Sequence, residues 1–231
     1  MATCCSCSSQ SFRGGVPVID RDLPVRRPLD PPLWAGVVLA IVALGLLAIP
    51  MLVIGALVRL TGPGPALLRQ RRVGLAGEPF TLYKFRTMRV GGSDAAHREL
   101  IARELRGEDT LIDGSCKLDT DPRITRFGSW LRRTSLDELP QLINVVRGDM
   151  ALVGPRPCLE WEAAMFPAAY AERFTVRPGM TGLWQVNGRS TMGTLEMLQL
   201  DLAYVRQRCF WSDLVILART VPSMLRGGGS R

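Results

Sequence analysis

The sequence is poor in histidine and in aromatic residues. Its 231 residues contain one histidine, His97, and aromatic residues make up 6% of the chain. Acid–base or triad chemistry based on histidine is therefore disfavoured. No zinc-finger spacing and no aromatic RNA-binding motif is present, so base stacking has little to act through and no nucleic acid is expected as a partner. His97 lies in a charged stretch and is predicted to sit on a solvated helix face.

The chain also lacks the cysteine pattern of a disulfide framework. Cys116, Cys158 and Cys209 are isolated from one another, and the cluster from Cys4 to Cys7 precedes any sequence typical of a folded domain. Structural disulfides are therefore not expected, which fits a reducing compartment. Cys4 and Cys7 lack a second pair of metal ligands, so a flexible tail is favoured over a metal site.

Acidic residues are fewer than basic ones. The sequence has 29 Lys and Arg against 21 Asp and Glu, a formal net charge of +8, and a pI near 9.7. Such a balance indicates a polyanionic partner, whether nucleic acid, anionic lipid or a phosphorylated substrate. Because aromatic residues are sparse, phosphate and membrane are the favoured partners.

Residues 33–58 contain no charged side chain, which is the strongest physical signal in the sequence. As one straight helix, these 26 residues would reach about 39 Å, more than the roughly 30 Å of a hydrocarbon core. Pro50 leaves arms of about 25 Å and about 12 Å, neither of which crosses alone. Arginines flank both ends, which favours the cytoplasmic side for both. A re-entrant membrane helix broken at Pro50 satisfies both observations, and a tilted span merely kinked there is the alternative.

The rest of the chain divides around this apolar run. Residues 1–32 are rich in Ser, Gly and Pro and are predicted to form a flexible arm rather than a secretory signal. Residues 59–225 form the predicted catalytic domain, and residues 226–231 a disordered tail. Within the domain, residues 60–72 are predicted to be a turn followed by a basic segment on the lipid headgroups.

Residues 78–88 alternate apolar and polar side chains in the manner of a short strand, with Lys84 and Arg86 on the same face. Two cations at this spacing form either an anion clamp or a solvated edge. A glycine-rich loop that can approach a ligand closely is predicted at residues 177–189. Polar or amphipathic helices are predicted at residues 93–108, 124–133, 194–208 and 211–225.

The stretch from Ser135 to Pro157 concentrates the candidate chemistry. Ser135 and Glu138 have the S-x-x-E spacing of a capping box, which predicts a helix that begins at Ser135. Asp137 and Glu138 then fall in its first turn, where the helix dipole favours ionised carboxylates and free amides favour an anion. An acidic pair in this position is also ordinary helix capping, so it does not by itself establish catalysis.

Residues 148–149, Gly-Asp, are predicted to end this helix, and residues 154–157, Gly-Pro-Arg-Pro, to form a rigid turn that presents one guanidinium. The strings TSLDELPQLINVVRGDM and LVGPRP occur in one order with KFRTM, RPGMTG and the proline-broken apolar run, across about residues 30–225. In these motifs the chain resembles the bacterial sugar transferase family, the monotopic phosphoglycosyl transferases, in their small single-domain form.

The resemblance implies an α+β, mainly helical fold. A re-entrant membrane helix hairpin and amphipathic interfacial helices would accompany a small globular catalytic core with short β-strands. The resemblance also implies a location at the cytoplasmic face of the bacterial inner membrane. One departure from the family is Ile49, because members commonly carry Ser before the hairpin proline, where its hydroxyl can bond the carbonyl freed by the kink.

The reaction that the resemblance implies has two steps. Asp137, matching the family's nucleophile, would attack the sugar-linked phosphate of a UDP-sugar, release UMP and form an aspartyl phosphosugar. Undecaprenyl phosphate would then take the phosphosugar, with Glu138 assisting proton removal. A Mg²⁺ ion held by Asp137 and the diphosphate would offset the negative charge. The substrate-binding cations are predicted to be Lys84, Arg86, Arg132, Arg156 and Arg189.

Two other functions fit the same features. A non-catalytic, membrane-anchored module would use the basic surface to hold anionic lipid or a glycan-assembly partner. A phosphodiesterase would hydrolyse lipid-linked or nucleotide diphosphates with the same residues. The identity of the sugar, the glycan pathway and the oligomeric state, a homo-oligomer included, stay open.

Overall fold

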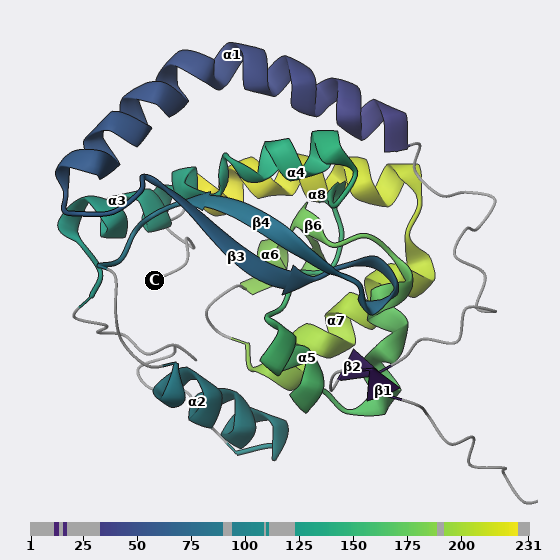
Figure 1. The fold of residues 1–231 in the computed structure, drawn as a ribbon. Coiled ribbons are helices and arrows are strands. Elements are labelled where there is room, and N and C mark those ends of the chain that lie inside the picture. Colours follow the sequence, from purple (N-terminus) through teal and green to yellow (C-terminus); the bar gives the residue numbers. More distant parts are fainter. Residues whose placement is uncertain are drawn as a thin grey trace, which may run out of the picture.

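The computed structural model describes residues 33–89, 94–108, 110, 123–188 and 192–225, together with the backbone of residues 12–13 and 16–17. A long helix arches over a body of short helices and small two-stranded sheets (Figure 1). This arrangement confirms the predicted α+β, mainly helical class. The predicted tail at 226–231, and the predicted arm apart from the four residues named above, lie outside the described residues.

The α-helices are α1 (Leu33–Leu60), α2 (Ala95–Leu105), α3 (Arg126–Thr134), α4 (Gln141–Arg147), α5 (Glu160–Met165), α6 (Leu183–Gly188), α7 (Thr194–Gln207) and α8 (Phe210–Leu225). The 3-10 turns are η1 (Leu75–Gly77), η2 (Leu136–Glu138) and η3 (Ala168–Thr175). The strands are β1 (Phe12–Arg13), β2 (Val16–Pro17), β3 (Leu67–Val73), β4 (Pro79–Phe85), β5 (Ala151–Val153) and β6 (Gly179–Thr181). Strands β1 and β2 pair in antiparallel fashion, as do β3 and β4, whereas β5 and β6 are parallel.

Helix α1 is long and apolar enough, by length and composition, to cross a membrane. Its 28 residues form one helix that runs through Pro50, so the predicted break at Pro50 is absent. A proline removes one helical hydrogen bond and can bend a helix without ending it, and α1 is an arch in Figure 1. The helix is therefore continuous through Pro50, and the predicted re-entrant hairpin in a bilayer stays a prediction.

One face of α1 packs on the body along the whole helix. Ala40, Ile54 and Val58 are buried, and the partly buried positions between them continue the same face at helical spacing. Ala40 packs in a cluster with Leu142 of α4, and Val58 in a cluster with Phe85 of β4. The opposite face exposes large apolar side chains along its length. A surface of this kind indicates membrane association.

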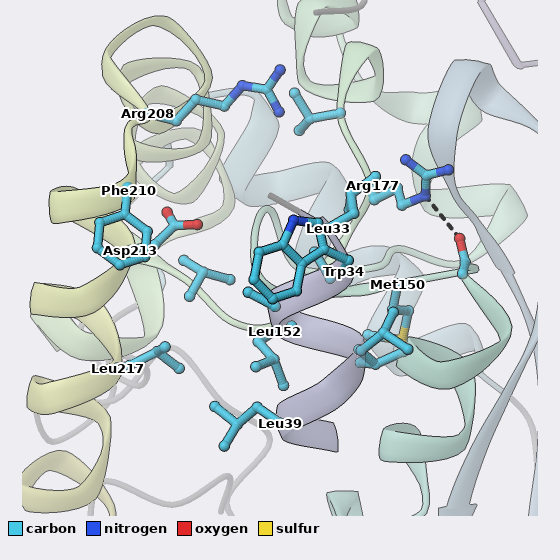
Figure 2. Close-up of a pocket in the computed structure, with 18 of the residues that line it drawn as sticks. Leu33, Trp34, Leu39, Met150, Leu152, Arg177, Arg208, Phe210, Asp213 and Leu217 are labelled. Atoms are coloured by element: carbon cyan, nitrogen blue, oxygen red, sulfur yellow. Dashed lines mark hydrogen bonds between the residues drawn. The ribbon is translucent and has the colours of Figure 1, made fainter. Parts of the chain in front are cut away.

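The apolar surface continues from α1 onto α8. A cavity of about 790 Å³ lies between the N-terminal part of α1 and α8. Trp34 and Leu39 of α1 and Phe210 and Leu217 of α8 line it (Figure 2). Trp211, next to this cavity along α8, is 71% exposed. The predicted amphipathic helix at the C-terminal end of the domain is thus confirmed, and its apolar side chains extend the surface formed by α1.

The prediction for residues 60–72 is wrong in part. Leu67–Val73 is strand β3, which pairs with β4 along its whole length, so the basic run belongs to a hairpin. Alternate side chains of a strand face opposite ways. Arg71 is therefore exposed while Arg72 is buried, with 7% of its surface accessible.

The remaining predicted elements are present with one exception. Helices cover most of the four predicted segments, as α2, α3, α7 and α8. The predicted loop at residues 177–189 instead contains strand β6 and helix α6. Gly179 permits the pairing of β6 with β5, because a Cβ atom at this position would lie 2.1 Å from the backbone nitrogen of Gly154.

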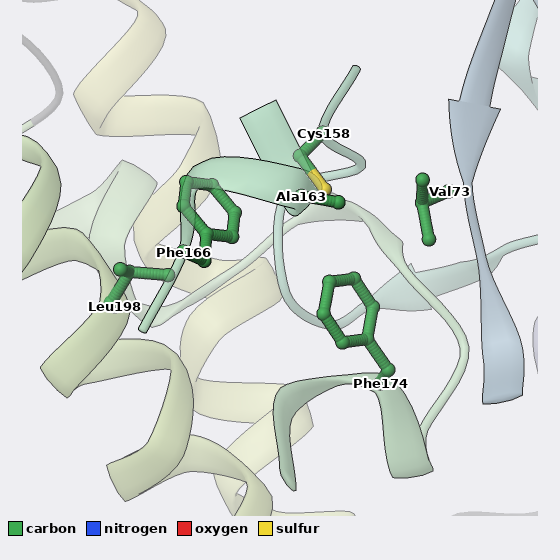
Figure 3. Packing of buried hydrophobic residues seen from close by; sticks show 6 residues of the cluster. All are labelled: Val73, Cys158, Ala163, Phe166, Phe174 and Leu198. Carbon is green, nitrogen blue, oxygen red and sulfur yellow. The ribbon is translucent and has the colours of Figure 1, made fainter. Parts of the chain in front are cut away.

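A hydrophobic cluster beneath the β3–β4 hairpin joins segments that are distant in the sequence (Figure 3). Its members come from β3, the segment before α5, α5 itself, the residue after α5, η3 and α7. Each fully buried apolar side chain stabilises the fold by about 1.5–3 kcal/mol. The buried residues are Val73, Cys158, Ala163, Phe166, Phe174 and Leu198.

Candidate active site

The acidic pair, Asp137 and Glu138, lies in the 3-10 turn η2 between α3 and α4. A helical turn begins after Ser135, as predicted, but it is a 3-10 turn and the predicted capping box is absent. Ser135 adopts the left-handed conformation, with φ of 55°, and its side chain makes no capping hydrogen bond. The α-helix begins only at Gln141, after Pro140, because Pro140 has no N–H to continue an α-helical ladder. The chain reverses at Ser135 and sets η2 against β4.

Asn144 fixes α4, and with it η2, relative to β4. Its side chain is fully buried. The Nδ2 group donates to the carbonyl of Thr81 (2.7 Å) and to the carboxylate of Asp149 (3.1 Å). The backbone N–H of Tyr83 donates to Asn144 Oδ1 (3.1 Å). These bonds hold the acidic pair in register with Lys84, the next residue of the strand.

Asp137 is 5% exposed and lies among charged groups. Burial, followed by the neighbouring Glu138, raises its pKa to about 6, while Lys84 and Arg132 act in the opposite direction. A small cavity of about 30 Å³ lies between the β3–β4 hairpin, η2, the start of α4, the turn at residues 154–157 and α6. Glu138 and Lys84 line this cavity, whereas Asp137 does not. The carboxylate is thus largely desolvated and directly beside the cavity-lining groups.

Lys84 is the centre of a group of positive charges. Burial, followed by the charge of Arg72, lowers the pKa of Lys84 to about 8, and Asp137 acts to raise it. Arg132 and Arg156 also lower this pKa. Like charges that depress a lysine pKa mark a site prepared for an anion.

Arg132 comes from the last turn of α3. Thr125 caps this helix by accepting a hydrogen bond from the Gly128 N–H (2.9 Å). A Cβ atom at Gly128 would lie 2.1 Å from the Thr87 carbonyl oxygen, so glycine is needed for this close approach of α3. The Arg132 Nε then donates to Thr87 Oγ1 (3.0 Å), which holds the guanidinium stem beside the end of β4.

The turn at residues 154–157 is held by three donors. The carbonyls of residues 155, 156 and 157 accept hydrogen bonds from the Gly179 N–H (2.9 Å), Arg173 (2.9 Å) and Arg72 (3.0 Å) in that order. This confirms the predicted rigid turn. Arg156 lines the cavity, and its guanidinium lies 5.6 Å from the centre of the Trp184 ring, in a cation–π arrangement.

Arg86 does not lie with these residues. Its guanidinium donates to the carbonyls of Val58 (3.2 Å), Gly62 (2.7 Å) and Pro63 at the end of α1. Arg86 therefore ties the end of α1 to the β3–β4 hairpin instead of sharing a face with Lys84. The other predicted cation, Arg189, lies outside the described residues.

Four residues that line or support the cavity are not among those predicted from the sequence. Arg72 was assigned to a headgroup-bound segment, although the alternation of residues 67–73 is a strand signal. Gln141 and Gln185 line the cavity, and Trp184 supports Arg156. Gln185 and Trp184 belong to α6, a helix that is not predicted because the sequence around it is rich in glycine.

The carboxylates near the cavity could hold a metal ion only together with a bound substrate. Within the parts of the chain that the structure describes, no group of three or more His, Cys, Asp and Glu could hold a metal ion by itself. Mg²⁺ is commonly bound by one or two carboxylates together with substrate phosphates. Asp137 and Glu138 supply such carboxylates beside cations suited to phosphate, so the residues fit Mg²⁺ only in the presence of a phosphorylated substrate.

The turn η2, which contains the acidic pair, packs directly on the apolar helix α1. Leu136 and Leu139, which flank the acidic pair, belong to the cluster that contains Ile54 and Val58 of α1. The structure thus combines an apolar surface typical of membrane association with a buried carboxylate among cations. In agreement, the sequence model described as bacterial sugar transferase matches residues 33–227, and the chain belongs to this family.

The chain matches several curated relatives, and it spans between about a third and most of their length. It is 44% identical over 203 residues to the UDP-glucose:undecaprenyl-phosphate glucose-1-phosphate transferase of Caulobacter vibrioides, a match that covers 81% of this chain and 68% of that protein. It is 38% identical over 194 residues to the exopolysaccharide production protein ExoY of Rhizobium meliloti, covering 84% and 85%. It is 41% identical over 169 residues to the galactosyl transferase CpsE of Streptococcus agalactiae, covering 73% of this chain but 36% of that protein.

Proposed function

We propose that the protein is a phosphoglycosyl transferase that moves a sugar phosphate from a UDP-sugar to undecaprenyl phosphate. The product would be an undecaprenyl-diphosphate sugar, the lipid-linked start of a polysaccharide or other glycan. The name of the Caulobacter relative supports this reaction class, and the name of the Rhizobium relative supports a role in exopolysaccharide production. The observation that carries the proposal is the acidic pair, Asp137 and Glu138, set among Lys84, Arg132 and Arg156 and packed on α1.

In the first step, a carboxylate oxygen of Asp137 attacks the phosphorus that bears the sugar. The bond from Asp137 to phosphorus forms, the bond between that phosphorus and the oxygen bridging to UMP breaks, and UMP leaves with the electron pair. Two unit charges 4 Å apart repel by about 4 kcal/mol at an effective dielectric of about 20. Lys84, Arg132 and Arg156 offset this repulsion and the charge that develops on the leaving group.

In the second step, a phosphate oxygen of undecaprenyl phosphate attacks the same phosphorus. The new diphosphate bond forms, the bond to Asp137 breaks, and the free carboxylate of Asp137 is restored. Glu138 lines the cavity and is placed to accept the proton of the incoming phosphate. Leu136 and Leu139 pack on α1, so the nucleophile lies next to the surface where a lipid acceptor is confined.

Mg²⁺ belongs to the proposal as a substrate-linked cofactor. Asp137, with the diphosphate of the bound UDP-sugar, would hold the ion. When bound, the ion neutralises phosphate charge and orients the diphosphate. Asp137 itself must remain ionised and reach the phosphorus in line with the leaving oxygen.

The placement in the membrane also belongs to the proposal. We place α1 in the cytoplasmic leaflet of the bacterial inner membrane as a re-entrant helix. Its inner face packs on the body at both Ala40 and Val58, and its outer face is apolar. A helix held to one body at both ends leaves that body on one side of the bilayer.

The test is UMP release from a panel of UDP-sugars by the purified protein and matched variants. Asp137→Asn should reduce UMP release by about a thousandfold or more, and Glu138→Gln by about tenfold to a hundredfold. Glu160→Gln, at an exposed ion pair with Arg71, is the control and should keep wild-type activity. Persistent turnover by Asp137→Asn would contradict the covalent mechanism.

Product analysis separates the alternatives. A transferase yields the lipid-linked sugar diphosphate and depends on undecaprenyl phosphate for continued turnover. A phosphodiesterase releases free sugar phosphate without the lipid. A non-catalytic lipid-binding module releases no UMP from any UDP-sugar but associates with anionic vesicles.

A further inference from the structure

The small cavity beside the acidic pair contains a neutral hydrogen-bonding group that the proposed mechanism does not use. Lys84, Arg72 and Arg156 supply positive charge to its wall and Glu138 supplies a carboxylate. Gln185, from helix α6, lines the same cavity. Phosphate chemistry accounts for the charged groups, and it leaves the amide without an assigned role.

Gln185 is 5% exposed, and its Oε1 atom has no hydrogen-bond partner among the described residues. A buried polar atom without a partner carries the penalty of a lost hydrogen bond, so native structures rarely leave one unmet without a reason. Two other buried atoms in this state are close in the fold, namely Nε of Arg72 and the indole Nε1 of Trp184. Arg72 lines the cavity, and Trp184 packs under Arg156. Three of the five such atoms among the described residues thus lie at or next to this cavity, and the other two, Trp161 Nε1 and Arg208 Nε, belong to residues that do not line it.

The hydrogen-bonding chemistry of the Gln185 amide limits which group of a ligand can bind to it. Phosphate oxygens of a diphosphate accept hydrogen bonds, and the neighbouring guanidinium and ammonium groups are their natural donors. The Gln185 Oε1 atom can only accept, so a fully ionised phosphate cannot satisfy it. In the orientation that the structure gives, Oε1 needs a donor, and a hydroxyl group can supply one. On a UDP-sugar, the groups that can donate to Oε1 are the hydroxyls of the sugar and of the ribose and the uracil N3–H.

We propose that Gln185 binds a hydroxyl of the transferred sugar and so contributes to the choice of UDP-sugar. This inference rests on the proposed function. The sugar is attached to the phosphorus that Asp137 attacks, whereas the ribose is separated from that phosphorus by the second phosphate. The residue beside the phosphate-binding cations is consequently assigned to the sugar.

The experiment is a double-mutant cycle between the protein and its substrate. Gln185→Met keeps a similar volume and removes both hydrogen-bonding atoms. UMP release is measured for wild type and variant with the preferred UDP-sugar and with analogues that each lack one sugar hydroxyl. Asn187→Met, at an exposed position on the same helix, is the matched control and should behave as wild type.

We expect Gln185→Met to lower kcat/KM for the parent UDP-sugar by about tenfold to a hundredfold. Removal of one particular sugar hydroxyl should lower the wild-type value by a similar factor and should cost the variant nothing more. If the Met variant does not fold, the same double-mutant cycle is measured with Gln185→Asn, in which the amide is set back by one methylene group. Thermal unfolding of each variant checks that the protein is folded under the conditions of the kinetic assay.

Two outcomes would overturn the assignment. One is an equal loss with every deoxy-sugar, which would mean that Gln185 has no specific partner on the sugar. The other is coupling to a 2′- or 3′-deoxyribose analogue instead, which would place Gln185 on the nucleoside. Failure of the proposed function is distinguishable, because wild type itself would then release no UMP from any UDP-sugar.

Discussion

Arg173 donates a hydrogen bond to the backbone carbonyl of Arg156 (2.9 Å). The same guanidinium pairs with the carboxylate of Asp201 on α7 (2.7 Å), and the two side chains are 2% and 3% exposed. A buried ion pair of this kind contributes little net stability but is costly to break. Its structural effect is to fix the turn that presents Arg156 to the cavity.

Asp201→Asn should therefore affect both folding and substrate binding. Loss of the carboxylate leaves Arg173 buried without its counter-charge, which should destabilise the protein by about 3–5 kcal/mol. Because Arg156 is then less well positioned, KM for the UDP-sugar should rise at temperatures where the variant is folded. Thermal unfolding and steady-state kinetics measure the two effects.

The control for this prediction is Glu172→Gln. Glu172 forms an ion pair with Arg206 at the surface (2.8 Å), so its loss should cost less than about 1 kcal/mol. An Asp201→Asn variant that is destabilised but keeps the wild-type KM would show that the buried pair does not position Arg156.

The activity should have a bell-shaped dependence on pH. Asp137 must be ionised to attack, and its pKa is raised to about 6 by burial and Glu138. Lys84 must be protonated to bind phosphate, and its pKa is lowered to about 8 by burial and Arg72. A profile of kcat/KM should rise through the first value and fall through the second. Lys84→Arg should abolish the alkaline fall, since arginine keeps its charge; an unchanged alkaline limb would exclude Lys84 as its source.

The raised pKa of Asp137 also predicts a pH-dependent stability. A carboxyl group with a higher pKa in the folded state than its ordinary value of 3.8 makes the protein less stable as pH rises between the two values. A shift to about 6 corresponds to roughly 3 kcal/mol. Asp137→Asn should thus stabilise the protein above about pH 6 and have little effect near pH 3.8. Urea unfolding at both pH values tests this, and an Asn variant less stable than wild type at the higher pH would contradict it.

Arg86→Ala should weaken the attachment of α1 without removing activity. Loss of three hydrogen bonds to carbonyls at the end of α1 should destabilise the protein by about 2–4 kcal/mol. The folded variant should retain kcat/KM within a few-fold. Arg89→Ala, at an exposed position, is the control for stability. A large loss of kcat/KM with normal stability would instead support the earlier expectation that Arg86 binds substrate.

The membrane placement can be tested by cysteine labelling. In a variant without native cysteines, single cysteines at Gly15 and Gly228 would be exposed to an impermeant reagent outside intact cells. If α1 is re-entrant, neither position should react until the cells are opened. Reaction of only one position in intact cells would mean that α1 crosses the membrane.

Much of the candidate site could be predicted from the sequence because its residues belong to recognisable local motifs. Asp137, Glu138, Lys84, Arg132 and Arg156 were all named from their motifs, and the structure brings them together. Charge, spacing and resemblance suffice for such residues because each stands out in its own segment.

Other features depend on pairing that no local pattern specifies. Arg71 and Arg72 are chemically identical neighbours, and only the register of β3 on β4 decides which is buried. Every position of α1 is apolar over most of its length, so no periodicity reveals the face that packs on the body. The S-x-x-E spacing at Ser135 predicts the start of an α-helix, but Pro140 has no N–H to donate within an α-helix. The α-helix therefore begins only at Gln141.

The central claim is that Asp137 becomes covalently attached to the sugar phosphate. Its most direct test is the intact mass of the purified protein after mixing with its UDP-sugar in the absence of undecaprenyl phosphate, followed by peptide mapping. We predict a gain of one sugar phosphate on the peptide containing Asp137, release of one UMP per protein, and loss of the adduct on addition of the lipid. No adduct on wild type, with UMP released only when both substrates are present, would contradict the covalent intermediate.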